Sequence, residues 1–185
     1  TKTSTYAFRG VDSPDGVFYR HPEGGFWLPG KGLFRVDPWS DKNYQQSFET
    51  LIRKVMTNNK QALFEGAYGE NGKSIEAQAT VFLLHQNKKY TPELKYEQNA
   101  LSFEFAASFF EKPGTTLFQY KLEGFDKEWS NWDYVASKEY TNIPEGKYTF
   151  RVRSKNVYGT LGQDASYAFK ILPPWYRTIW AYLLW

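Results

Sequence analysis

The sequence contains no cysteine, one methionine and two histidines among its 185 residues. The lack of cysteine excludes disulfide bonds, thiolate nucleophiles and cysteine-ligated metals, and it is compatible with either the periplasm or the cytoplasm. His21 and His85 are far apart and belong to no His-x-His or His-Glu-x-x-His pattern. Because residues that commonly bind transition metals are few and scattered, the sequence predicts no metal site.

Signatures of catalysis and cofactor binding are also lacking. Residues 30–32 (Gly-Lys-Gly) have neither the spacing of a phosphate-binding loop nor a helix after them, and no nucleophile elbow is present. A pair of carboxylates for glycoside hydrolysis could be drawn only from Glu123, Asp126 and Glu128. All three lie in a predicted turn, where carboxylates are usually solvated. We therefore predict a non-catalytic chain without a cofactor.

Positively and negatively charged residues are nearly balanced in number. The 23 Lys and Arg residues against 20 Asp and Glu residues give a formal net charge of +3. Arg151, Arg153 and Lys155 lie on one face of a predicted strand, and we interpret that face as solvated or as an interface. A DNA-binding domain normally has a denser basic stripe, so no nucleic-acid partner is predicted.

Aromatic residues are abundant at 19% of the chain, and hydrophobic residues make up 41%. Aromatic side chains favour strands and sandwich cores, and they also occur on surfaces that stack on sugars. The hydrophobic content is sufficient for a core, which excludes a wholly disordered chain.

Residues 1–43 are divided by turn signals into short apolar runs at 16–20, 25–28 and 32–37. Three such short strands with tight turns are typical of a β-propeller blade. Only one copy is present, and a single blade cannot bury both of its faces. We interpret the segment as the last blade of a truncated propeller, with exposed strand edges. The alternative is an N-terminal hairpin extension of the next domain.

Residues 44–172 have the pattern of an antiparallel β-domain. In residues 99–105, Leu101, Phe103 and Phe105 alternate with polar side chains, which is the period of a half-buried strand. Strands are predicted at 48–56, 61–66, 79–85, 99–105, 117–122, 132–135, 148–154 and 165–172. Eight strands without a convincing helix predict an all-β fold, an immunoglobulin-like or fibronectin-type-III-like sandwich.

Residues 173–185 begin with Pro173 and Pro174, which end the last strand, and continue almost wholly apolar. A membrane span needs about 20 such residues, so this segment is too short to cross a bilayer alone. Its Trp and Tyr residues are typical of the outer interface of a transmembrane helix. We predict that 178–185 begin such a helix; the alternative is an apolar segment packed on the core.

The most informative stretch runs from Tyr120 to Asn156. It contains the segments 120–129 (YKLEGFDKEW) and 140–148 (YTNIPEGKY). A tyrosine directly after the Ile-Pro-Glu-Gly-Lys corner lies where sandwich domains place a tyrosine corner, whose hydroxyl bonds back to nearby backbone. This stretch resembles the three-tyrosine (Y_Y_Y) domain of bacterial sensor proteins, with a match from about Phe103 to about Asn156. Residues 23–38 resemble the propeller repeat of the same sensors. The family-motif residues, given structural roles, are Tyr120, Gly124, Trp129, Tyr140, Pro144, Gly146 and Tyr148.

The resemblance implies a periplasmic segment of a bacterial inner-membrane protein, a two-component sensor. In that role the domain passes a ligand-induced change from an upstream propeller to a membrane helix and a cytoplasmic output, which can be a histidine kinase. Homodimerisation through the sandwich is the expected mechanism, and a glycan would be bound mainly by the propeller. The alternative is a carbohydrate-binding sandwich that uses an exposed Trp129 or Trp132, since residues three apart in a strand face opposite ways. A generic adhesion domain and a hydrolase are weaker alternatives.

Overall fold

Alternating apolar residues build two four-stranded sheets that face each other across one core. The chain is described by a computed structural model that covers residues 19–20, 22, 24–29, 33–37, 43–58, 60–66, 86, 91–111 and 114–177. The first sheet has the order β6-β11-β10-β8 and the second β5-β4-β7-β9. Their strands are β4 (Thr50–Thr57), β5 (Ala62–Glu65), β6 (Glu93–Leu94), β7 (Leu101–Ala107), β8 (Leu117–Glu123), β9 (Ser137–Tyr140), β10 (Gly146–Lys155) and β11 (Ala165–Ile171). The predicted all-β, immunoglobulin-like sandwich is therefore confirmed.

The core lies where β7 of one sheet meets β10 and β11 of the other. Phe103 and Phe150 are fully buried and stack with ring centroids 4.0 Å apart and an interplanar angle of 12°. Phe105, Tyr167 and Phe169 extend the cluster on the same inward faces. Every second residue of these strands faces inward because successive side chains of a strand point to opposite sides. Most of the aromatic excess is thus accounted for by the core.

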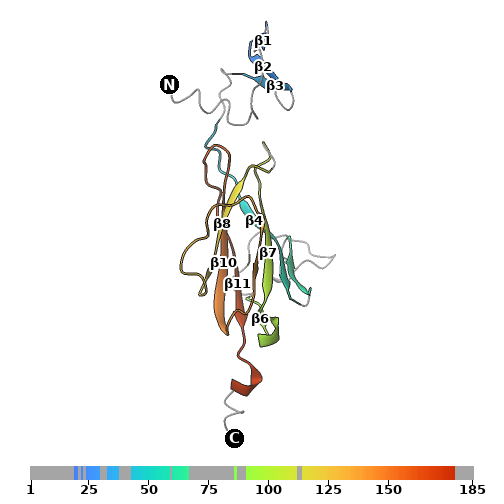
Figure 1. Ribbon diagram of the computed structural model, residues 1–185, viewed down its shortest axis with the longest axis vertical. Helices are drawn as coiled ribbons and strands as arrows, with labels where there is room; N and C mark the ends of the chain where they lie inside the picture. The colour runs from blue at the N-terminus through green and yellow to red at the C-terminus, as the bar shows by residue number, and fades with distance from the viewer. Residues whose placement is uncertain are drawn as a thin grey trace.

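The three short strands predicted near the N-terminus form a separate antiparallel sheet, β1-β2-β3. They are β1 (Tyr19–Arg20), β2 (Phe26–Pro29) and β3 (Leu33–Val36). Figure 1 shows this sheet at one end of the long axis and the 3-10 helix η2 (Trp175–Arg177) toward the other end. That the small sheet is a propeller blade stays a prediction, as do the domain limits at 43/44 and 172/173.

The predicted strand at 132–135 is wrong. Asp133 forms only an isolated bridge with Phe118, and its carboxylate accepts hydrogen bonds from the N–H groups of Tyr134 and Val135. An Asp that binds the backbone just after itself favours a turn. The strand here is β9, five residues further on, and it was not predicted.

Two short elements of the structure lie outside the predicted strands. The short strand β6, parallel to β11, and the 3-10 helix η1 (Tyr96–Gln98) were not predicted. The predicted strand at 79–85 and the predicted membrane helix at 178–185 lie outside the described residues. Among the residues that the model describes, no helix has the length and apolar character needed to cross a membrane.

Candidate functional site

Tyr148 fixes the corner that precedes β10. Its hydroxyl donates a hydrogen bond to the carbonyl oxygen of Pro144 at 3.0 Å, and its ring stacks on Phe169 with centroids 5.6 Å apart. A Cβ atom added to Gly146 would lie 3.1 Å from the hydroxyl oxygen, so this position has little room for a side chain. Burial, followed by the charge of Glu145, raises the pKa of Tyr148. The side chain thus has the geometry of a tyrosine corner.

Tyr140, at the end of β9, joins the second sheet to a turn of the first. Its hydroxyl donates to Oδ2 of Asp126 at 2.6 Å, and the same oxygen accepts the N–H of Leu122 at 2.8 Å. The Tyr140 ring packs edge-on against Phe103 and Phe125. Asp126, considered above as a catalytic carboxylate, therefore holds a turn and a buried tyrosine.

We predict that the free energy of unfolding falls in alkali, because the domain contains buried tyrosines. Burial, followed by the hydrogen bond to Asp126, raises the pKa of Tyr140 far above 10, and burial raises that of Tyr167. Below about pH 10 these tyrosines are neutral in the folded domain and in the unfolded chain. Above that pH they ionise in the unfolded chain while they are still neutral in the folded domain. Each tyrosine then lowers the free energy of unfolding by about 1.4 kcal/mol per pH unit. Urea unfolding between pH 9 and 11.5 measures this slope, and Tyr140→Phe should reduce it by one tyrosine's share. An unchanged slope in that variant would contradict the assignment.

Tyr120 and Gly124 shape the strand and turn before the tryptophans. The half-buried Tyr120 ring lies 6.1 Å from Phe105 and 6.4 Å from Phe150, and the ammonium of Lys138 lies 5.4 Å above it. Gly124 has φ +94°, and an added Cβ would lie 3.0 Å from the carbonyl oxygen of Lys147. A side chain is thus disfavoured there by both backbone conformation and space.

Residues 126–133 cover the outer edge of β8 without being a strand. The N–H of Ser130 donates to the carbonyl of Tyr120 at 2.9 Å, and the Ser130 hydroxyl accepts the N–H of Tyr120 at 3.1 Å. Phe118 and Asp133 exchange both backbone hydrogen bonds, at 2.7 and 3.0 Å. Backbone groups at this edge of β8 are thereby hydrogen-bonded, which removes a site for unwanted strand pairing.

Trp129 and Trp132 lie on the same face, so the expectation that they point to opposite faces is wrong. They are in the covering segment rather than in a strand, and both lean over the outward side chains of β10. The guanidinium of Arg153 lies 4.3 Å from the Trp129 ring and 5.6 Å from the Trp132 ring. The ammonium of Lys155 lies 4.3 Å from the Trp132 ring. These distances are within the range of cation–π attraction.

The hairpin of β10 and β11 holds the incoming chain at one end. The N–H of Thr50 donates to the carbonyl of Gln163 at 3.0 Å, and the N–H of Gln163 donates to the carbonyl of Phe48 at 2.8 Å. The hydroxyl of Thr160 donates to the carbonyl of Tyr44 at 2.9 Å. The loop of the hairpin is therefore bonded to the chain segment that enters the sandwich.

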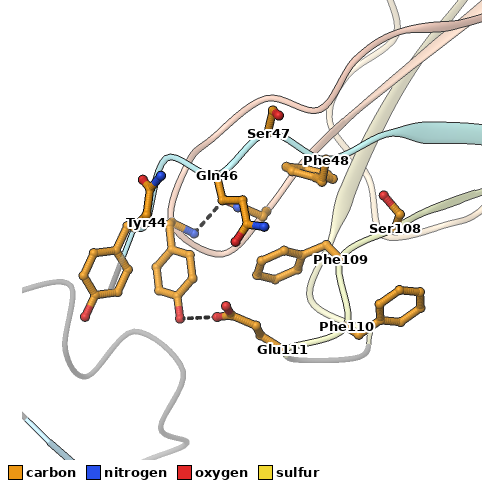
Figure 2. Close-up of a pocket in the computed structure, with 11 residues that line it drawn as sticks. Tyr44, Gln46, Ser47, Phe48, Ser108, Phe109, Phe110 and Glu111 are labelled. Atoms are coloured by element: carbon orange, nitrogen blue, oxygen red, sulfur yellow. Dashed lines mark hydrogen bonds between the residues drawn. The ribbon is translucent and has the colours of Figure 1, made fainter. Parts of the chain in front are cut away.

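A hollow of about 230 Å³ lies beside this junction, and Figure 2 shows its aromatic lining. The Phe109 ring lies 5.5 Å from Phe48 and 6.1 Å from Tyr158, and the Tyr158 hydroxyl donates to Glu111 at 2.7 Å. Phe110 is 81% exposed and points away from Phe109 (Figure 2). The hollow is smaller than the roughly 300–1,000 Å³ usual for small-molecule pockets, so we treat it as part of the junction.

The opposite end of the hairpin holds the outgoing chain. The N–H of Leu172 donates to the carbonyl of Leu94 at 2.8 Å. The guanidinium of Arg177 lies 2.6 Å from Oε1 of Glu145, which follows the proline that binds Tyr148. The Glu145 backbone N–H, followed by Arg177, lowers the pKa of Glu145. The tyrosine corner and the outgoing 3-10 turn are thus anchored to one short loop.

Sequence reasoning missed both of these junctions. The Glu145–Arg177 pair joins residues 32 apart, and the Thr160–Tyr44 bond joins residues 116 apart. Neither contact has a local sequence pattern that would predict it. The seven motif residues, in contrast, gather around the β8 turn, β9 and the corner of β10.

Comparison with known proteins gives a family match over the second half of the sandwich. Residues 109–172 match the model of the Y_Y_Y domain. None of the curated proteins matches the chain.

Two solved extracellular domains of B. thetaiotaomicron match the chain, and the one with a TM-score above 0.5 has a similar fold. One belongs to BT3049, assigned as a hybrid two-component system, with 20% identity and a TM-score of 0.57 over 85% of this chain and 20% of that one. Another belongs to BT4673, assigned as a one-component system, with 25% identity and a TM-score of 0.49 over the same shares. The chain thus spans about a fifth of the length of these structures. From the family match and the geometry of its tyrosines, the chain carries a Y_Y_Y domain at residues 109–172.

Proposed function

We propose that the chain is a non-catalytic, periplasmic juxtamembrane relay of a two-component sensor. It passes a ligand-induced change from an upstream propeller to a membrane helix that follows the sandwich. The observation that carries this proposal is the β10–β11 hairpin, whose loop binds the incoming segment and whose far end adjoins the anchored outgoing turn. The Y_Y_Y family match and the similar fold of the extracellular domain of BT3049 support the setting.

The hairpin has the properties that a mechanical connection requires. β10 is 10 residues long, which at about 3.3 Å per residue spans roughly 33 Å. It is hydrogen-bonded to β8 and β11 on its two sides, and Figure 1 shows it lying along the long axis of the molecule. A strand in the middle of a sheet resists bending, so a shift of its loop moves the whole sandwich as one body. The displacement then reaches the turn held by Glu145.

The output step that we propose is symmetric dimerisation of the sandwich. Two membrane-tethered copies have a raised effective concentration, and a closed two-fold contact would bring their membrane helices together. A glycan bound mainly by the upstream propeller is the proposed signal. Sedimentation velocity of residues 44–172 over a wide concentration range tests the contact. A strict monomer would assign the dimer contact to another part of the sensor.

The relay is tested by breaking the Glu145–Arg177 pair in the full-length sensor with Arg177→Gln. The pair is exposed, so the free energy of unfolding should change by no more than about 1 kcal/mol. Signal output to a reporter gene should nevertheless fall, because the outgoing turn loses its anchor. Lys54→Gln, which breaks the 3.0 Å Lys54–Glu65 pair on the other sheet, is the matched control. Equal output from both variants would contradict a relay through Glu145.

A further inference from the structure

The outer surface of the β6-β11-β10-β8 sheet, here called the basic face, concentrates positive charge. Its outward positions alternate with the buried Tyr148, Phe150 and Val152 of β10. Six cations and two carboxylates lie on these strands, and Asp164, which precedes β11 and pairs with Arg151, brings the net charge to +3. The charged residues are Glu93, Lys121, Glu123, Lys147, Arg151, Arg153, Lys155, Asp164 and Lys170.

The opposite sheet does not share this charge. Its strands β4, β5, β7 and β9 have two cations and three exposed carboxylates outside the Lys138 that covers the tyrosine rings. These five residues are Arg53, Lys54, Glu65, Glu104 and Glu139. With Lys138 counted, the opposite sheet has no net charge, so the positive excess is confined to the basic face and an anionic partner is attracted to that face.

Two outward cations of β10, Arg153 and Lys155, are not neutralised by a carboxylate within the described part of the chain. Arg151 pairs with Glu123 at 3.1 Å and Asp164 at 2.9 Å, so its charge is balanced. Arg153, in contrast, donates two hydrogen bonds to the neutral amide oxygen of Gln119, at 2.9 and 2.7 Å. Lys155 forms no ion pair among the residues that the model describes, and it lies over Trp132.

Aromatic rings and cations alternate along one strip of the basic face. Arg151, Trp129, Arg153, Trp132 and Lys155 succeed one another, with every cation within 5.6 Å of a ring centroid. Outward residues of a strand repeat about every 6.7 Å, so the strip presents regularly spaced positive charges on an open surface. An extended polyanion fits such a strip better than a compact ligand does.

We propose that this strip of the basic face binds an acidic polysaccharide, whose carboxylates or sulfates contact Arg153 and Lys155. The guanidinium and ammonium groups occupy the ring faces that lean over β10, so a neutral sugar has no access to those faces. Anionic groups bind the cations directly, and the rings hold the cations in place. This inference is independent of the proposed relay, because it concerns the side of the sandwich rather than its ends.

The experiment measures binding of the whole 185-residue chain to two probes, polygalacturonate and dextran sulfate, by tryptophan fluorescence and calorimetry. Neutral dextran is the negative control. We expect saturable binding of at least one acidic probe, weakened by salt. In the double variant Lys121→Glu/Lys155→Glu, the affinity should fall about tenfold, since two attractive charges become repulsive. The carboxylated and sulfated probes identify which anionic group is preferred.

A matched control separates this site from the effect of net charge. Arg53→Glu/Lys60→Glu changes the formal charge by the same amount at β4 and its turn to β5, on the opposite sheet, and it should keep the affinity within about twofold. Equal losses in the two double variants, or binding of neither acidic probe, would overturn the proposal. All four side chains lie outside the hydrophobic core, so both variants should fold. Unfolding curves of both variants verify this.

Discussion

Replacing Tyr148 by alanine is expected to lower the free energy of unfolding by about 3–5 kcal/mol, as truncation of a buried aromatic side chain does. The side chain is 6% exposed, and its ring stacks on Phe169 in the core. Its removal leaves a cavity beside β11 and frees the carbonyl of Pro144 from its hydrogen bond. Urea unfolding followed by tryptophan fluorescence measures the loss.

The matched control for this change is Tyr148→Phe, which keeps the ring and removes only the hydroxyl. Because the bond to Pro144 is a neutral hydrogen bond, its loss should cost about 1 kcal/mol. The ratio of the two effects separates packing from the corner hydrogen bond. If Tyr148→Phe were as damaging as Tyr148→Ala, the hydroxyl rather than the ring would hold the corner. An alanine variant of native stability would contradict the structural role altogether.

The loop that Tyr148 binds also connects stability to the proposed relay. Pro144 accepts the tyrosine hydroxyl and Glu145 holds Arg177, so loss of the corner should loosen the outgoing turn as well. Tyr148→Phe in the full-length sensor is therefore expected to reduce signal output while the domain remains folded. An unchanged output would separate the corner from the relay.

The strands with regular burial could be predicted from the sequence. Leu101, Phe103 and Phe105 alternate with polar residues, and the buried positions of β10 do the same. An alternation of apolar and polar residues with period two indicates a strand with one buried face. Both of these strands have such a face because they lie in the middle of the sandwich. The three-tyrosine segment was located by its local motif, and its resemblance to the Y_Y_Y domain agrees with the family match over residues 109–172.

Other elements could not be predicted, because distant contacts determine them. β9 reads Ser-Lys-Glu-Tyr and has one apolar residue, so only its pairing with β7 identifies it as a strand. Trp129 and Trp132 looked like strand residues, but Asp126, Ser130 and Asp133 bind the edge of β8 and prevent a regular strand. The orientation of the two rings then follows from the cations of β10, not from their spacing.

Phe103→Ala is expected to lower the free energy of unfolding by about 3–5 kcal/mol, because Phe103 links the two sheets. It belongs to β7, is fully buried, and stacks on Phe150 of β10 at 4.0 Å. Its ring also lies 6.2 Å from Tyr140 and 6.3 Å from Tyr167. An alanine here opens a cavity between the sheets that surrounding aromatic rings are too rigid to fill.

Phe103→Leu is the control, since it keeps most of the apolar volume and should cost about 1–2 kcal/mol. A double-mutant cycle with Phe150→Leu isolates the stacked pair, for which we expect a coupling energy of about 0.5–1.5 kcal/mol. Urea unfolding of the four proteins gives this value. A coupling near zero would mean that the rings stabilise the fold only by burial. A coupling in the expected range means that the stacked pair itself stabilises the contact between β7 and β10, beyond the burial of each ring.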